Sequence, residues 1–344
     1  MENILALRKK ISLIGSGKIK NILLIQPIQV SEKKLDIKIS LNKRYYMYPP
    51  YALGILNTVL KKNKYFSSIT DLNFEVFNYI STNKNCSTNE LTDKWKSVLK
   101  KALSENKYDV VGVSCTFTMN HENMIEIFNE VKKFNKSIIT IAGGVHVSNA
   151  TELVLKEGKN IDFALTYEAE KSFVNFLDFI NGNNDLKPYQ VSTIYKDRFY
   201  QVSDRKNPEE HELNAIPDYG NLDISKLTEL GEIGTFRYWR PKNSKGSAVL
   251  SNKGCRARCS FCSVRNFNGK GVRAKSIQTV IDELKGLKEM YGINHITWLD
   301  DDLFFDRDRT LNLFNEIVRN NLNVTWDASN GLIASAAVAH PELI

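Results

Sequence analysis

Three cysteines in the second half of the chain are the residues best suited to chemistry. Cys255, Cys259 and Cys262 stand in the segment GCRARCSFC, with the spacing C-x3-C-x2-C. Three thiolates on one short loop can each bind one iron of a [4Fe–4S] cubane. The fourth iron then has no protein ligand, so a small molecule can bind there and receive an electron by direct coordination. We therefore expect a redox-active cluster on these three cysteines.

A zinc site is the main structural alternative for the triplet. Structural zinc usually takes four ligands in two Cys-x2-Cys-like pairs, and here only one triplet is present, with His295 as a distant fourth candidate. The chain has five cysteines, an odd number that is unlike the disulfide framework of a small secreted domain. Cys86 and Cys115 are interpreted as a loop thiol and a buried small hydrophobe. Chance clustering of inert cysteines is a further alternative for the triplet.

The position of the triplet supports a catalytic role. Its loop follows the apolar segment Ser247–Ser251, a predicted strand, and βα barrels place their chemistry at the carboxyl ends of strands. Four nearby arginines would favour the negative charge of the thiolates and the cluster: Arg256, Arg258, Arg265 and Arg273.

A second group of polar residues and glycines follows predicted strands in the first half. Ser114-Cys115-Thr116 ends one strand, Gly143-Gly144 comes 26 residues later, and His146 lies just beyond. Hydroxyls at a strand's carboxyl end can bond the tail of a ligand, and paired glycines let a backbone pass closely. The alternatives are strand-end capping for the hydroxyls, a tight turn for the glycines, and a loop histidine bonded to backbone.

The elements that position this second group alternate between strand and helix. Five βα units in series imply an α/β domain with a doubly wound parallel sheet, flavodoxin-like or Rossmann-like, over residues 1–205. Strands are expected at Asn21–Gln26, Asn73–Asn78, Asp109–Ser114, Ser137–Ala142 and Ile161–Thr166. Helices are expected at Pro50–Lys61, Thr88–Leu103 and Glu122–Phe134, from Thr151 onward, and again up to Ile180. A hairpin, Val191–Tyr195 with Phe199–Val202, closes the region.

The cysteine loop belongs to a second βα series at residues 245–344, after a polar, proline-containing linker at 206–244. Strands are expected at Ser247–Ser251, His295–Leu299 and Val324–Ala328, and helices at Ile277–Met290 and Arg309–Arg319. Three βα units cannot close a barrel, and an open three-stranded sheet would leave apolar faces and an edge uncovered. We interpret this series as an incomplete (β/α) barrel, either because the chain is a fragment or because a partner completes the sheet.

Composition limits the class of protein. Hydrophobic residues make up 42% of the chain, enough for a core in each half. No apolar run approaches the roughly 18–20 residues of a membrane span, and the N-terminus lacks the features of a signal peptide, so we expect a cytoplasmic protein. The net charge of +8 is interpreted as a solvated lysine-rich surface. Because no basic run alternates with aromatic residues, the sequence gives no support for a nucleic-acid partner.

The motif GCRARCSFC after a strand resembles the signature of the radical S-adenosylmethionine (SAM) enzymes, which have an aromatic residue before the third cysteine, here Phe261. The resemblance implies that the fourth iron chelates the amino and carboxylate groups of SAM. Reduction then breaks a C–S bond and gives a 5′-deoxyadenosyl radical. In the family, the end of the second barrel strand contacts the methionine amino group, which implies a role for Asp300, Asp301 or Asp302. The alternative for these aspartates is an acidic first turn of a helix.

The first half resembles cobalamin-binding domains, which have Ser-x-Leu at one strand end and Gly-Gly after the next. Here the pattern is Ser114-x-Thr116 and Gly143-Gly144. DFALTYEAEKSF, with Tyr167 and Glu168, resembles the next strand and its acidic turn. The cobalt-ligating D-x-H-x-x-G motif is absent, and its nearest counterpart is Pro49-x-Tyr51-x-x-Gly54. Many radical SAM proteins with this domain lack the histidine, so the resemblance implies cobalamin bound without a protein nitrogen below cobalt.

Together the resemblances, over residues 20–335, imply a cobalamin-dependent radical SAM enzyme. Methyl transfer to an unactivated carbon is the expected reaction, and oxidative cyclisation or rearrangement is the runner-up. A fragment that binds cluster and cobalamin without catalysis is a third alternative. The expected partners are a small-molecule or natural-product substrate and an electron donor of the flavodoxin or ferredoxin type.

Overall fold

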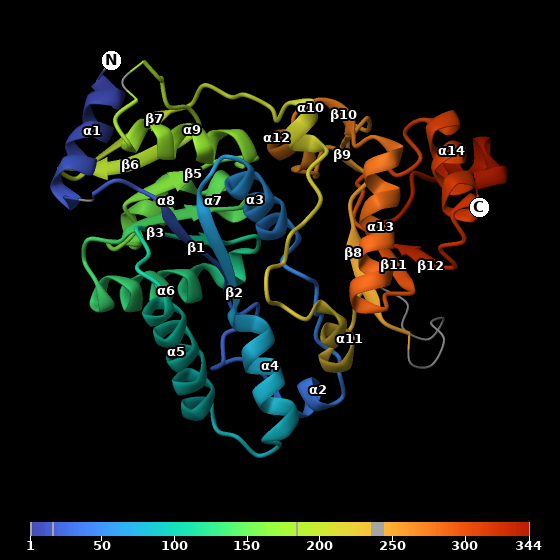
Figure 1. Ribbon diagram of the computed structural model, residues 1–344, viewed down its shortest axis with the longest axis horizontal. Helices are drawn as coiled ribbons and strands as arrows, with labels where there is room; N and C mark the ends of the chain where they lie inside the picture. Colours follow the sequence, from blue (N-terminus) through green and yellow to red (C-terminus); the bar gives the residue numbers. More distant parts are fainter. Residues whose placement is uncertain (1, 16, 184, 235–243, 344) are drawn as a thin grey trace. The chain divides into compact units, whose positions relative to one another are not determined.

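The computed structural model describes residues 2–15, 17–183, 185–234 and 244–343. They form two units that interleave along the chain (Figure 1). Unit 1 consists of Met1–Ile37, Ala52–Glu212 and Pro217–Leu222, and unit 2 of Lys38–Tyr51, Leu213–Ile216 and Asp223–Ile344. The predicted linker, 206–244, therefore contributes described residues to both units, while 235–243 lie outside the described residues.

A seven-stranded sheet organises unit 1, in the order β2-β1-β3-β4-β5-β6-β7. Neighbours from β2 to β5 are parallel. Because the chain turns from one side of β1 to the other, right-handed crossovers place helices on both faces, as in flavodoxin-like sheets. This confirms the predicted doubly wound sheet. Its parallel strands are β1 (Asn21–Gln26), β2 (Phe66–Asp71), β3 (Val110–Ser114), β4 (Ile139–Gly143) and β5 (Phe163–Leu165).

The predicted hairpin is β6 (Val191–Tyr195) and β7 (Arg198–Val202). It continues the sheet beyond β5 in the antiparallel sense. Its two turn residues, Lys196 and Asp197, have φ of 50° and 58°, the positive values that a two-residue type I′ turn requires.

One predicted strand is wrong. Residues 73–78 lie inside a helix, α4 (Leu72–Thr82), and the second strand is the preceding segment, β2. Asp71 ends that strand and caps the helix, because its side chain accepts a hydrogen bond of 2.9 Å from the Phe74 amide. Leu72, Val76 and Ile80 then recur every four residues and are all buried, which is helical spacing.

The other helices associated with unit 1 follow the expected βα order, apart from an additional N-terminal helix. Ser87 and Glu90 begin α5 with a reciprocal capping box. The helices are α1 (Glu2–Ile14), α3 (Tyr51–Lys62), α5 (Thr88–Glu105), η1 (Thr118–Asn120), α6 (His121–Phe134), α7 (Val145–Asn149), α8 (Thr151–Glu157), α9 (Glu170–Ile180) and α10 (Glu210–Leu213).

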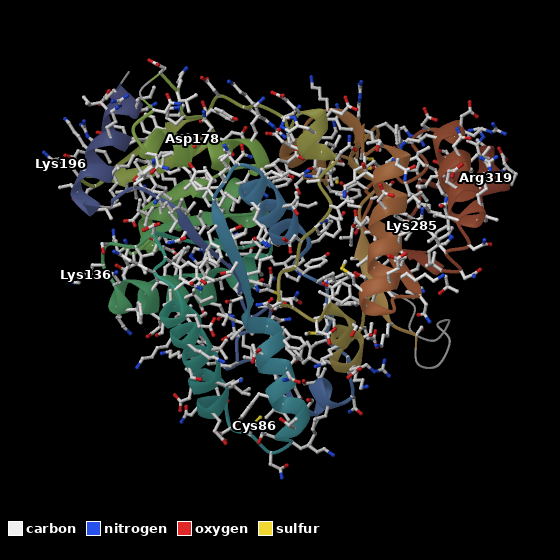
Figure 2. All side chains as sticks on the ribbon, viewed as in Figure 1. Cys86, Lys136, Asp178, Lys196, Lys285 and Arg319 are labelled. Atoms are coloured by element: carbon white, nitrogen blue, oxygen red, sulfur yellow. The ribbon has the colours of Figure 1, made fainter. Side chains whose placement is uncertain are left out.

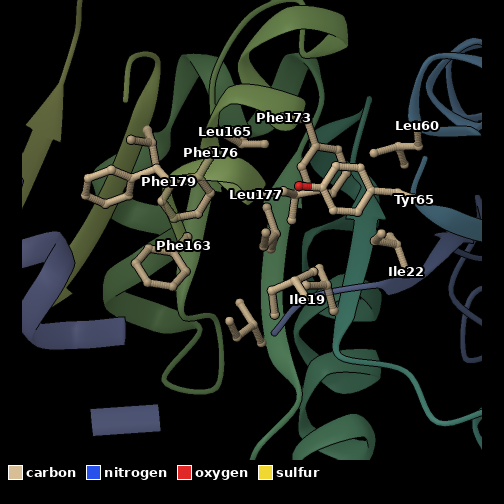
Figure 3. Close-up of a cluster of buried hydrophobic side chains, with 14 of the residues drawn as sticks. Ile19, Ile22, Leu60, Tyr65, Phe163, Leu165, Phe173, Phe176, Leu177 and Phe179 are labelled. Carbon is tan, nitrogen blue, oxygen red and sulfur yellow. The ribbon is translucent and has the colours of Figure 1, made fainter. Parts of the chain in front are cut away.

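An apolar core fills unit 1 on the α9 side of the sheet (Figure 3). Phe163 of β5 packs edge-on against Phe176 of α9, with ring centroids 4.9 Å apart. Ile22 and Leu24 of β1 belong to the same cluster and are at most 1% exposed. This burial of a continuously apolar strand agrees with the interior position of β1 between β2 and β3.

Unit 2 contains a three-stranded parallel sheet in the order β12-β11-β8. The strands are β8 (Gly246–Val249), β11 (His295–Trp298) and β12 (Thr325–Ala328), and the helices between them are α13 (Ile277–Tyr291) and α14 (Arg307–Arg319). This is the predicted βα series. Smaller helices are α2 (Ile37–Leu41), η2 (Ile224–Lys226), α11 (Leu227–Leu230), α15 (Ala334–Ala339) and η4 (Pro341–Leu343).

One further element of unit 2 is not predicted by the sequence pattern. Between β8 and α13 the chain forms an antiparallel hairpin, β9 (Asn252–Cys255) and β10 (Gly271–Ala274), with α12 (Val264–Asn268) in its connection. Cys255 is the last residue of β9. The cysteine loop is therefore built on a hairpin of its own rather than directly on β8.

The basic surface agrees with a solvated lysine-rich exterior. Lys136, Lys196 and Arg319 lie exposed on the two units (Figure 2). Cys86, in contrast, is 6% exposed and lies after α4. Among the described residues, no helix is long and apolar enough to cross a membrane.

Candidate active site

The three cysteines lie on one turn that begins at the end of β9. Cys255 is half-buried, whereas Cys259 and Cys262 are exposed. The Cys262 amide donates to the Cys259 carbonyl at 3.1 Å, and the Ala257 amide lies 3.3 Å from Cys255 Sγ. Burial raises the pKa of the Cys255 thiol, and the hydrogen bond from Ala257 opposes that rise. An amide that points at sulfur stabilises a thiolate, so this turn is suited to hold anionic sulfur.

The donor set fits an iron–sulfur cluster better than a single zinc ion. In the part of the chain that the structure describes, no three Cys, His, Asp or Glu side chains converge closely enough to hold one metal ion. A cubane demands less convergence, because each thiolate binds its own iron. His295, the distant zinc candidate, is buried, and its two ring nitrogens lie 2.8 Å from Thr325 Oγ1 and 3.0 Å from Asp327 Oδ2. Both nitrogens are thus engaged within the sheet.

The arginines near the triplet hold its backbone. Arg265 donates to the Ala257 carbonyl at 3.2 Å, and Arg273 donates to the Asn268 carbonyl at 2.9 Å. Arg256 pairs with Asp302, with 2.9 Å between Nε and Oδ2. These contacts shape the loop in addition to contributing positive charge. Phe261, in contrast, is 90% exposed on the same turn.

The acidic run after β11 lies against the cysteine hairpin. Asp300 is 1% exposed and accepts hydrogen bonds from the Ser251 amide and hydroxyl at 2.9 and 2.5 Å. Burial raises the pKa of Asp300 to about 6, against the hydrogen bonds from Ser251. Asp301 is half-buried and accepts from the Asn268 side chain at 3.1 Å. Asp301 is the most exposed of the three carboxylates, whereas Asp302 is 2% exposed.

The Ser-x-Thr and Gly-Gly segments meet at the carboxyl edge of the unit 1 sheet. Ser114 and Gly143 are register partners on β3 and β4. The Gly143 carbonyl accepts from the Cys115 amide at 2.7 Å. Ser114 is half-buried and Thr116 is exposed. The strand order thus brings together two segments that are separated by 26 residues in the sequence.

The two glycines differ in why they are needed. Gly144 has φ of 105°, and a Cβ there would lie 2.5 Å from the Cys115 carbonyl oxygen. Gly144 is therefore required by the packing of β4 against the end of β3, with or without a ligand. A Cβ at Gly143 would lie no closer than 3.8 Å to a described atom. Gly143 is the glycine that leaves space at this edge.

His146 belongs to a chain of hydrogen bonds. Its Nδ1 lies 3.2 Å from Thr118 Oγ1 and its Nε2 lies 2.9 Å from His121 Nδ1, while His121 Nε2 lies 2.8 Å from Glu157. The Glu157 carboxylate can only accept, so the network assigns N–H to Nε2 of both histidines and makes the Thr118 hydroxyl a donor. Burial and the neighbouring His121 lower the pKa of His146. Both of its nitrogens are engaged with protein.

The segment after β5 joins the same edge. Ser148 accepts from the Tyr167 amide at 2.7 Å and donates to the Gly144 carbonyl at 2.9 Å. Tyr167 has φ of 61°, and the Arg205 guanidinium lies 4.4 Å from its ring centroid. Glu168 is buried, and its carbonyl accepts from Gln190. The predicted residues after β3, β4 and β5 are therefore neighbours.

Tyr51 and Gly54 contact residues other than those at the carboxyl edge of the unit 1 sheet. The Tyr51 hydroxyl accepts from Lys275 at 2.8 Å and donates to Glu283 at 3.1 Å, in a buried cluster of unit 2. Gly54 packs against the segment after α10, where a Cβ would lie 2.8 Å from Pro217 Cβ and 3.1 Å from the Tyr219 ring. In this structure both residues take part in packing. The sequence motif P-x-Y-x-x-G gave no sign of these partners.

Comparison with known proteins agrees with this arrangement. Residues 37–177 match the family model of the B12 binding domain. An uncharacterized methyltransferase of Pyrococcus horikoshii is 25% identical over 236 residues, which are 68% of this chain and 48% of that protein. Cytidylyl-2-hydroxyethylphosphonate methyltransferase of Streptomyces wedmorensis is 25% identical over 77% of this chain and 53% of its own. Anaerobic magnesium-protoporphyrin IX monomethyl ester cyclase of Rubrivivax gelatinosus is 22% identical over 70% and 41%.

Solved structures share the fold. The radical SAM methyltransferase TsrM of Kitasatospora setae, with cobalamin and a [4Fe–4S] cluster bound, aligns with a TM-score of 0.61 at 18% identity. The alignment covers 88% of this chain and 51% of TsrM. The chain thus spans about half the length of the relatives that it matches. With a B12-binding match in its first part and the three-cysteine hairpin in its second, the chain is similar in sequence to methyltransferases and a cyclase and shares the fold of a radical SAM methyltransferase.

Proposed function

We propose that this chain provides the cobalamin-binding and cluster-binding parts of a radical SAM methyltransferase. The observation that supports this most directly is the three-thiolate turn at the end of β9, in a chain whose residues 37–177 match the B12 binding domain. When bound, the cluster supplies the electron that cleaves the C–S bond of SAM, and cobalamin supplies a methyl carrier. The protein residues bind and orient these groups.

Each group has its own proposed residues. Cys255, Cys259 and Cys262 hold the cluster, and Phe261 lies beside it on the exposed turn. Asp301 is the proposed contact for the amino group of SAM, because it is the acidic-run carboxylate with the most exposure. For cobalamin, Ser114 and Thr116 offer hydroxyls, Gly143 leaves space for a close approach, and the neighbouring Tyr167 and Glu168 complete the edge. His146 acts by holding the Thr118 loop.

The proposed reaction is methyl transfer to an unactivated carbon of a small molecule. Two of the relatives described above bear methyltransferase names and one is a cyclase, which favours methyl transfer over ring formation. An external electron donor of the flavodoxin or ferredoxin type is proposed, because cleavage of SAM at the cluster consumes an electron that the cluster must receive from another molecule.

Anaerobic reconstitution tests the cluster assignment. The protein is incubated with iron, sulfide and reductant, desalted, and given SAM. We expect broad iron–sulfur absorption and release of 5′-deoxyadenosine. Cys259→Ala should lose both signals, whereas Cys86→Ala, at a buried cysteine of unit 1, should keep them. Full iron content and cleavage in Cys259→Ala would overturn the assignment.

Hydroxocobalamin binding tests the unit 1 edge. Gly143→Trp should fill the space beside β4 and abolish retention of corrin absorption after desalting. Gly17→Trp is the matched control, because a Cβ there meets no described atom within 4 Å. Equal corrin retention by the two variants would move the cobalamin site away from this edge.

A further inference from the structure

In the described part of the chain, the outer edge of β9 pairs with no other strand. β9 pairs with β10 on one side, and the bond from the Lys275 amide to the Ser251 carbonyl, at 2.9 Å, continues that pairing. In an antiparallel ladder, alternate residues direct their amides to the partner and away from it. The Ser251 carbonyl faces β10, and the amides of Asn252, Gly254 and Arg256 bond on the opposite side.

The acidic run lies along that opposite side. The Asp300 carboxylate accepts from the Asn252 amide, and Asp301 accepts from the Gly254 amide. The Arg256 amide lies 3.4 Å from Asp302 Oδ2. Three consecutive carboxylates therefore follow three alternate residues, two in β9 and Arg256 directly after it. They satisfy an edge that would otherwise expose unpaired amides.

Two side-chain clamps reinforce this contact at its ends. At the base of the hairpin, the Asp300 carboxylate also accepts hydrogen bonds from the Ser251 amide and hydroxyl. There, Arg309 of α14 donates to the Ser251 and Lys275 carbonyls at 3.1 and 2.9 Å. At the tip, Arg256 pairs with Asp302 and donates to the carbonyls of Phe304 and Phe305 at 2.9 and 3.1 Å. Arg256 directly follows Cys255, so the tip clamp fixes the start of the cysteine turn.

We propose that Asp300 and Asp302 are positioning residues that hold the cysteine hairpin in its cluster-binding form before any metal binds. Asp300 acts on the base through Ser251, and Asp302 acts on Cys255 through Arg256. Both carboxylates are at most 2% exposed, and loss of a partner while a carboxylate stays buried is strongly unfavourable. The inference rests on the proposed function only for the identity of the group that the cysteines bind.

Amide hydrogen exchange in the metal-free protein tests this role. In the wild-type protein, the amides of Asn252, Gly254 and Arg256 should be protected relative to those of the exposed loop residues 258–260. Asp302→Asn should speed exchange at Gly254 and Arg256 by about tenfold or more, the ratio that ~1.4 kcal/mol of local opening produces. Asp308→Asn is the matched control, because Asp308 lies nearby on α14 with its side chain 82% exposed.

A double-variant comparison separates positioning from SAM binding. If Asp302 acts through Arg256, then Arg256→Gln should also speed exchange, and adding Asp302→Asn to it should have little further effect. Arg256 is 45% exposed on its side chain, so this variant decides the question even if Asp302→Asn does not fold. Exchange equal to wild type in both single variants, with only SAM binding weakened, would overturn the proposal and make Asp302 a SAM contact.

Iron content separates this inference from the proposed function. Positioning predicts that Asp302→Asn and Arg256→Gln take up less iron per chain than the Asp308→Asn control under limiting iron. If the wild-type protein itself takes up none, the proposed function fails. The exchange measurement on metal-free protein still decides the role of Asp302.

Discussion

Replacing one member of the buried cluster Tyr51–Lys275–Glu283 should strongly destabilise unit 2. The side chains of Lys275 and Glu283 are each 2% exposed, with 2.8 Å between Nζ and Oε2. The Tyr51 hydroxyl bonds to both, and Lys275 Nζ lies 5.3 Å from the Tyr51 ring centroid. Removing one partner of such a pair leaves an uncompensated buried charge, which costs roughly 3–5 kcal/mol. Burial already raises the pKa of Glu283, so proton uptake relieves part of the cost in Lys275→Met.

The size of the loss should depend on which group is removed. Glu283→Gln and Lys275→Met should each reduce the free energy of unfolding by about 3 kcal/mol or more. Tyr51→Phe removes hydrogen bonds to charged groups and should cost about 1.5–3 kcal/mol. The double variant Lys275→Met with Glu283→Leu leaves no buried charge, so it should be more stable than either single variant.

Urea unfolding, followed by amide exchange of peptides from α13, measures this in unit 2 alone. Glu283 lies on α13, and Lys275 precedes it directly after β10. Single variants that lose less than about 1 kcal/mol would refute the reasoning. So would a double variant whose loss equals the sum of the two single losses, because coupled partners are not additive.

Three further predictions concern unit 1. Burial raises the pKa of Asp71 from 3.8 to about 7. The folded protein therefore binds this proton more tightly than the unfolded chain does. The free energy of unfolding should fall by up to roughly 4 kcal/mol as the pH rises from about 4 to 7. Asp71→Asn, which keeps an N-cap, should flatten that profile in urea titrations at several pH values. Gly144→Ala should lower the free energy of unfolding by at least about 2 kcal/mol through a strained φ and a clash with Cys115, whereas Gly143→Ala should have little effect on thermal unfolding. Ser87→Ala should cost about 1 kcal/mol by removing the cap of α5, and an unchanged melting temperature would contradict it.

Local pattern predicted much of the fold. The apolar runs at 21–26 and 109–114 gave β1 and β3 within one residue, because a strand covered on both faces must be apolar throughout. The short apolar run at 73–78 fits either period, so the pattern predicts a strand where the structure has a helix. The Asp71 carboxylate accepts a hydrogen bond from the Phe74 amide. This N-cap favours a helix for the segment that follows.

The candidate site, like the fold, is predicted only in part by local sequence pattern. Cysteine spacing by itself predicts that Cys255, Cys259 and Cys262 lie on one short turn, because few residues separate them. The sequence also predicted that the Ser-x-Thr and Gly-Gly segments lie at strand ends, and parallel pairing of β3 and β4 then makes Ser114 and Gly143 partners.

The sequence alone therefore determined the groups of residues that lie within one loop or at one strand end. The tertiary structure decided the partners that come from distant segments. Only folding showed that Asp300–Asp302 lie along β9, that Tyr51 binds Lys275 and Glu283, and that His146 is engaged by Thr118 and His121. The physical reason is that a buried carboxylate or imidazole must find hydrogen-bond partners, but its own type and neighbours in the sequence do not say which segment will supply them.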